Sequence, residues 1–105
     1  MPPFNMTLNA RNCEVLCRIF VEPTRADIDW DDLVRLVVAL GGEWPKMGHT
    51  SGSRRRAKLN GVKGLFHKPH PGSVMKKGSV ESAREFLQRA GVTPVSEGCK
   101  CSQTS

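Results

Sequence analysis

Apolar residues recur at helical spacing in three stretches of the chain. The spacing predicts a first helix over residues 9–20. A second helix follows Asp29, a good N-cap residue, and ends at Gly41. A third begins with Ser79 as its N-cap and ends at Gly91. The three apolar stripes are Cys13, Leu16, Cys17 and Phe20; then Leu33, Leu36, Val37 and Leu40; then Val80, Ala83, Phe86, Leu87 and Ala90.

Between the second and third helices the pattern changes to that of a β-hairpin. Asn60-Gly61 suits a two-residue type I′ turn, which needs positive φ at both central positions. Such a turn sets Arg54 opposite His67. Because side chains alternate across a strand, the hairpin acquires two different faces. The inner face holds Ala57, Leu59, Val62, Gly64 and Phe66, with Arg55 at its end, and the outer face holds Arg54, Arg56, Lys58, Lys63, Leu65 and His67.

The order of elements indicates an α+β domain. Residues 43–47 read as a short strand or an irregular lead-in, and with the hairpin they predict a three-stranded antiparallel sheet. Helices on one face of that sheet form a two-layer sandwich and leave the other face for a ligand. A single domain is expected over 1–92, with a helical addition at 9–22, a core at 29–92 and a flexible tail at 93–105. Trp30 and Trp44 are assigned to packing.

Charge is strongly segregated along the chain, whose net charge is +6. The window 46–79 contains nine basic residues, all three histidines and no acid, so the remainder has seven basic and ten acidic residues. Such segregation favours a polyanionic partner, although a solvated charged face is the simpler alternative. RNA is favoured over DNA, since the helix after Asp29 begins with acidic residues and does not suit the major groove.

The four cysteines and the N-terminus bear on the compartment. The sequence MPPFNMTLNA lacks the pattern of a signal peptide, and no apolar run is long enough to cross a bilayer, so we expect a cytoplasmic protein. The spacings C-x3-C and C-x-C are not the usual zinc knuckle. Disulfides are disfavoured in a reducing compartment. Cys13 and Cys17 are therefore expected as thiols on the apolar stripe of the first helix, and Cys99 and Cys101 as thiols in the tail, with a zinc- or redox-linked regulator as the alternative.

The outer face of the hairpin has the residue types that RNA cleavage without a metal or cofactor requires. Histidine suits proton transfer near neutral pH, and arginine and lysine suit the phosphate. His67 and Arg54 lie opposite each other in the predicted register. His70 could turn back beside them after Pro69, or could simply bond to nearby backbone; His49 is a weaker candidate. Candidate RNA contacts are Ser53, Arg55, Arg56, Lys58, Lys63, Lys68, Lys76 and Lys77, the last two at a helix start that favours anions.

The stretch from about Asp29 to Val92 resembles HicA toxins, the small partners of HicB antitoxins. The resemblance implies an α-β-β-β-α fold related to the double-stranded RNA-binding domain, cleavage of messenger RNA, and inhibition by a HicB-like antitoxin; the first helix is an addition. The matching features are Gly52-Ser53 before a basic strand, the turn Pro69-His70-Pro71, and Lys77-Gly78-Ser79 opening a helix that ends in Ala90-Gly91.

One position departs from the family pattern. The catalytic histidine of the family follows the Gly-Ser pair, and here that residue is Arg54, as in a variant branch with G-S-R. We therefore expect His67 to supply the imidazole from the neighbouring strand, with Arg54 binding phosphate. The alternative is an RNA-binding module of the same fold that does not cut its ligand.

Overall fold

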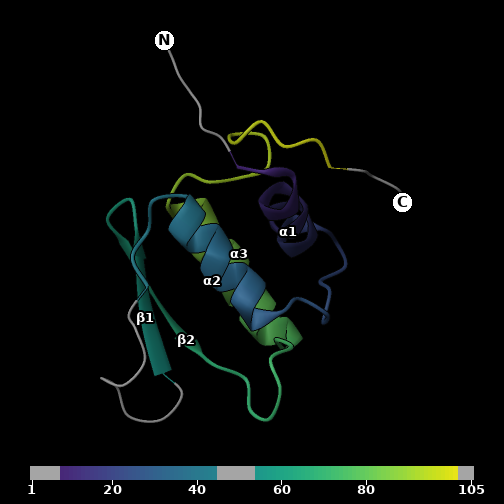
Figure 1. The fold of residues 1–105 in the computed structure, drawn as a ribbon, viewed down its shortest axis with the longest axis vertical. Coiled ribbons are helices and arrows are strands. Elements are labelled where there is room, and N and C mark those ends of the chain that lie inside the picture. Colours follow the sequence, from purple (N-terminus) through teal and green to yellow (C-terminus); the bar gives the residue numbers. More distant parts are fainter. Residues whose placement is uncertain (1–7, 45–53, 102–105) are drawn as a thin grey trace.

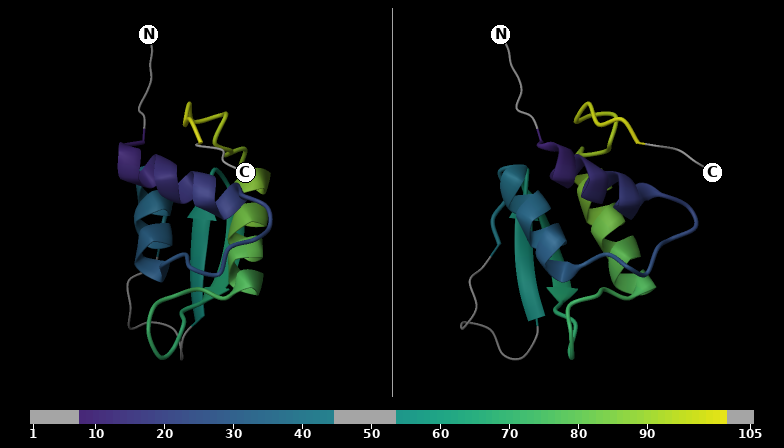
Figure 2. Two further views of the ribbon diagram at one scale, coloured as in Figure 1. Left: turned by 90° about the vertical axis from the view of Figure 1, so that its right-hand side faces the viewer. Right: turned by 45° about the vertical axis from the view of Figure 1, so that its right-hand side comes forward.

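The computed structural model describes residues 8–44 and 54–101, which form an α+β fold in layers. A two-stranded hairpin packs on one side of α2 and α3, and α1 crosses the other side of these two helices (Figures 1 and 2). No helix in the described residues is long and apolar enough to cross a membrane. The elements are α1 (Ala10–Phe20), α2 (Trp30–Ala39), β1 (Arg54–Leu59), β2 (Val62–His67) and α3 (Lys77–Arg89).

The helix ends follow the capping residues in two of the three helices. The Asn9 side chain accepts a hydrogen bond from the backbone of Asn12, and the Asp29 side chain accepts one from Asp31. These contacts confirm the predicted starts of α1 and α2. The predicted start of α3 is wrong. Ser79 lies inside its first turn, because the backbone carbonyl of Lys76 already accepts a helical bond from Val80, and no side chain caps this end.

The hairpin has the predicted register, from Arg54 opposite His67 to Leu59 opposite Val62. The predicted three-stranded sheet is not formed in the described part of the chain, where the sheet has two strands. Glu43 makes one isolated bridge to Lys58, with N–O distances of 2.7 and 3.0 Å. The ring of Trp44 packs against the core, and residues 45–47 lie outside the described residues.

One continuous core joins all the elements. Ala57, Leu59 and Phe66 of the hairpin face the helices, as the alternation predicts. Trp44 packs between Trp30 and Phe66, with ring centroids 5.3 and 5.7 Å away, so the assignment of both tryptophans to packing is confirmed. The predicted stripe of α1 is shifted. Its buried residues are Val15, Leu16 and Ile19, and Cys13, Cys17 and Phe20 lie half-buried at its edge.

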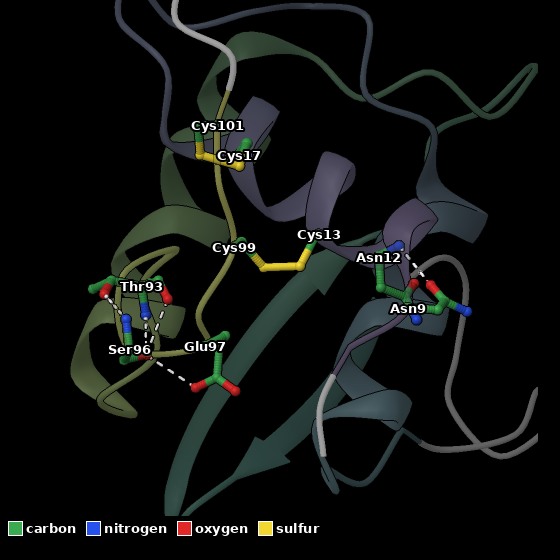
Figure 3. The surroundings of a disulfide bond; sticks show 9 residues. All are labelled: Asn9, Asn12, Cys13, Cys17, Thr93, Ser96, Glu97, Cys99 and Cys101. Carbon is green, nitrogen blue, oxygen red and sulfur yellow. Dashed lines mark hydrogen bonds between the residues drawn. A yellow bond between two sulfur atoms is a disulfide. The ribbon is translucent and has the colours of Figure 1, made fainter. Parts of the chain in front are cut away.

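The cysteines correct the sequence interpretation. They are not thiols: Cys13 is bonded to Cys99 and Cys17 to Cys101 (Figure 3). Residues 93–101, predicted as the first part of a flexible tail, are therefore held against α1. Spacing along the chain could not show this pairing, because the bonded residues are 86 and 84 positions apart.

Candidate nucleic-acid interface

The outer face of the hairpin carries basic side chains away from the helices. Arg54, Arg56, Lys58, Lys63, Leu65 and His67 are all exposed, and we call this set the cationic platform. Arg54 and His67 are directly paired at the open end of the hairpin, and Lys58 and Lys63 are paired beside the turn. Leu65 is 49% exposed within this basic surface. A side chain of this kind can contact the apolar part of a base or sugar while its neighbours contact phosphate.

The turn fixes the hairpin to the end of α3. Asn60 has a φ of +50° and Gly61 one of +81°, as a type I′ turn requires. The Asn60 side chain also donates a 2.8 Å hydrogen bond from its Nδ2 to the carbonyl oxygen of Ala90. On the inner face, the rings of Phe66 and Phe86 meet edge to face at 5.5 Å. The hairpin that carries the platform is thus held to α3 both at its turn and at Phe66.

The open end of the hairpin gathers further elements of interest. β1 begins there, β2 ends there, and the segment that follows β2 leads to the first turn of α3 (Figures 1 and 2). This segment is tied to the start of α2. Ser73 donates a 2.5 Å hydrogen bond from its hydroxyl to the Asp29 carboxylate, and the Trp30 backbone donates a 2.7 Å bond to the Ser73 carbonyl. The tie restricts where the preceding residues, His70 among them, can lie.

The other predicted site residues occupy several places. Lys68 and His70 are exposed in the segment after β2, and Lys76 and Lys77 are exposed at the start of α3. All four therefore lie on the elements that meet at the open end of the hairpin, where the start of α3, which has no acidic residue in its first turn, favours anions. Ser53 and His49 lie outside the described residues.

Arg55 is separated from the platform. It is half-buried on the inner side of β1, opposite Phe66, and its Nη1 donates a 2.8 Å hydrogen bond to the carbonyl oxygen of Arg54. The alternation of side chains along β1 explains this position. Its role as an RNA contact is less well supported than that of Arg54 or Arg56, which point outward.

Two contacts at this site were missed by the sequence interpretation. The bond from Asn60 to Ala90 joins residues 30 positions apart, and the bond from Ser73 to Asp29 joins residues 44 apart. Asn60 and Asp29 each have a sufficient local role, in the turn and as an N-cap. Because that local role already accounts for each residue, nothing in the sequence indicated its second, long-range hydrogen bond.

The fold and this surface define a small α+β domain with an exposed basic face on its hairpin. A family model described as HicA toxin of bacterial toxin–antitoxin matches residues 30–92, more than half of the chain. The chain therefore belongs to the HicA toxin family. The matched region leaves out α1 and the segment after Val92. Searches of curated proteins and of solved structures gave no significant match.

Proposed function

We propose that this HicA family member is an endoribonuclease toxin that cleaves messenger RNA in the cytoplasm, and that a HicB-like antitoxin inhibits it by covering the cationic platform. The observation that carries the proposal is the pairing of Arg54 with His67 on the exposed face of the hairpin. This pairing sets a proton-transfer group beside a phosphate-binding group on adjacent strands.

The chemistry assigned to these residues is transfer of the phosphoryl group to the neighbouring 2′-oxygen. The His67 imidazole accepts the proton of the 2′-OH as its oxygen attacks phosphorus. Arg54, with Arg56 beside it on the same face, binds the non-bridging oxygens and offsets the charge that develops on them. The 5′-oxygen leaves with a proton, for which His70 is the candidate donor. No metal or cofactor is required by this scheme.

The second candidate is an RNA-binding module that does not cleave. It is favoured by the arginine at position 54, where the family pattern has its catalytic histidine. In that case the platform contacts phosphates and 2′-hydroxyls, and growth inhibition would come from occupying RNA. Both candidate functions use the same surface. They differ only in whether the imidazoles transfer protons or simply contact RNA.

The deciding experiment compares wild type with His67→Ala and Arg54→Ala after induced expression, and with a labelled RNA in vitro. Enzyme function predicts growth arrest with loss of messenger RNA in the wild type. His67→Ala should retain RNA binding and lose cleavage by at least about a hundredfold, the usual contribution of a general base. His70→Ala removes the candidate proton donor and should also lower cleavage, whereas Lys100→Gln, which removes an exposed cation outside the proposed site, is the control and should leave cleavage unchanged.

The other outcomes are equally informative. RNA binding by the wild type without any cleavage would contradict the enzyme and support the binding module. Cleavage that survives His67→Ala and is lost in His70→Ala would assign the role of general base to His70, in the segment after β2. If the wild type neither binds nor cuts RNA, both candidates fail.

A further inference from the structure

The four cysteines form two disulfides between α1 and the segment 93–101, which we call the C-terminal strap. We call Cys13–Cys99 the buried rung and Cys17–Cys101 the exposed rung. Cys13 and Cys17 are one helical turn apart, a rise of about 6 Å along α1. Two residues of extended chain span about 6–7 Å, so a C-x-C segment running beside the helix can meet both cysteines. The Cα–Cα distances of the two rungs, 5.4 and 5.5 Å, are nearly equal. The two unusual cysteine spacings are thus complementary to each other.

The rungs differ in their access to solvent. Cys99 is buried at 9% exposure, whereas Cys101 is exposed. A cavity of about 710 Å³ opens beside the exposed rung. It is lined by Cys17 and Cys101 and also by Cys13. The charged residues around this cavity are Glu14, Arg18, Arg25 and Lys100, three cations and one carboxylate. Such surroundings favour the approach of a thiolate and the release of another one.

The strap is folded as a unit of its own. Thr93 and Ser96 hydrogen-bond each other's backbone N–H through their hydroxyls, at 2.9 and 3.0 Å (Figure 3). The Cys99 backbone N–H donates a 2.8 Å bond to the carbonyl oxygen of Pro94. These bonds close the turn on itself. The two rungs join that turn to the half-buried edge of α1 that Cys13 and Cys17 form.

We propose that the Cys17–Cys101 disulfide is a thiol-exchange site at which a dithiol reductant begins the release of the C-terminal strap from α1. The reductant's thiolate attacks the Sγ of Cys101, an exposed residue in the lining of the cavity, and Cys17 leaves as a thiolate. The second thiol of the reductant then attacks the mixed disulfide, which frees Cys101 and leaves the reductant as a disulfide. Two electrons pass to the protein in this step. The same exchange at Cys13–Cys99, where Cys99 is buried, follows more slowly.

Release of the strap is separate from the RNA chemistry. α1 lies across α2 and α3 on the side away from the hairpin, so the platform keeps its residues in both states (Figure 2). What changes is the resistance of α1 and the strap to opening and proteolysis. In a reducing compartment the disulfides would be transient, which makes a reducible strap a means of setting the lifetime of the folded protein.

Thiol trapping of the full chain, prepared without reductant, tests the proposal. Mass spectrometry after N-ethylmaleimide treatment should find no adduct at first. Increasing dithiothreitol should then give a species alkylated at Cys17 and Cys101, followed by one alkylated at all four cysteines. Hydrogen exchange of residues 93–101 should rise severalfold on full reduction, and that of β1 and β2 should change little.

Two matched double variants isolate the rungs. C13S/C99S keeps only the exposed rung and C17S/C101S keeps only the buried one; we expect the first to be reduced severalfold faster. Equal rates would overturn the exchange site, and unchanged hydrogen exchange after reduction would overturn strap release. Four alkylated thiols in the unreduced protein, or four thiols protected by bound Zn²⁺ in native mass spectrometry, would overturn the paired disulfides themselves. None of these readouts depends on RNA cleavage.

Discussion

Arg54 and His67 are directly opposite each other in the last pair of the hairpin, and both side chains are exposed on its outer face. If this pair is the reaction centre, an imidazole on either strand should reach the same phosphate. We therefore expect Arg54→His to restore cleavage to a His67→Ala protein, to within about one or two orders of magnitude of the wild type, since a positioned general base is worth about 10²–10⁴-fold. Cleavage of a labelled RNA measures this, and His70→Ala in the same background shows whether the rescue needs a second imidazole.

The platform should bind RNA mainly through charge. Lys58→Gln and Lys63→Gln each remove one exposed cation beside the turn, away from His67. For single-stranded RNA, the logarithm of the binding constant falls with the logarithm of the salt concentration, and each variant should make this slope less steep by about 0.7. Fluorescence anisotropy across a salt series measures the slope. Lys100→Gln, on the C-terminal strap, is the matched control; an equal effect of this variant would show that binding is not confined to the platform.

The hairpin could be predicted from local sequence because each step was local. Asn60-Gly61 determines the turn, and a two-residue turn then fixes every pair up to Arg54 and His67. The predicted start of α3 was wrong. Ser79 is a good N-cap residue in isolation, yet the helix begins at Lys77 without any side-chain cap. At α2, where the Asp29 cap and the tertiary contacts agree, the prediction was right.

The parts that could not be predicted depend on distant contacts. Four cysteines permit several pairings, and only the folded chain places the C-terminal strap beside α1. The expectation of a reducing compartment then argued against any disulfide. At the candidate site, the sequence predicted which face Arg54 and His67 share, whereas the tie from Ser73 to Asp29 that anchors the His70 segment joins two elements far apart in sequence.

Gly64 is required for close packing between the hairpin and α3. A Cβ at this position would lie 2.7 Å from Cδ1 of Phe86 and 3.0 Å from Cε2 of Phe66. Because two rings would have to move, Gly64→Ala should lower the free energy of unfolding by about 1–3 kcal/mol. Gly78→Ala, in the first turn of α3 with nothing within 4 Å of the added atom, should leave it unchanged or raise it by up to about 1 kcal/mol. Urea unfolding of both variants measures the difference, and equal losses would contradict the packing argument.

Asp27 provides a prediction for acidic pH. The side chain of Arg25 donates two hydrogen bonds to its carboxylate, at 2.8 and 2.7 Å, and with Arg18 nearby the pKa of Asp27 is lowered to about 2. The folded pKa lies below the usual unfolded value of about 3.9, so the carboxylate stabilises the fold above about pH 4. That contribution is lost as the pH falls toward 2. Because both side chains are exposed, this contribution is small at neutral pH and is screened by salt.

The matching experiment is a double-mutant cycle with Asp27→Asn and Arg25→Gln, followed by urea unfolding between pH 7 and pH 2. The coupling between the two residues should be favourable at pH 7 and should shrink steadily below pH 4. A coupling that stays constant down to pH 2 would mean that the carboxylate is not the group that titrates.

The two rungs of the C-terminal strap should stabilise the protein in a non-additive way. Cys13–Cys99 and Cys17–Cys101 close loops of 86 and 84 residues, and the chain-entropy model gives about 4–5 kcal/mol for the first cross-link of this length. Once either rung is present, the other closes a ring of only a few residues, so it adds about 2–3 kcal/mol in the same model. Removing one pair, as in C13S/C99S or C17S/C101S, should therefore cost about 2–3 kcal/mol, and removing both should cost more than the sum of the two. Urea unfolding of the two double variants and of the quadruple variant measures this, and losses that simply add would show that the rungs act through local packing instead of through closure of the chain.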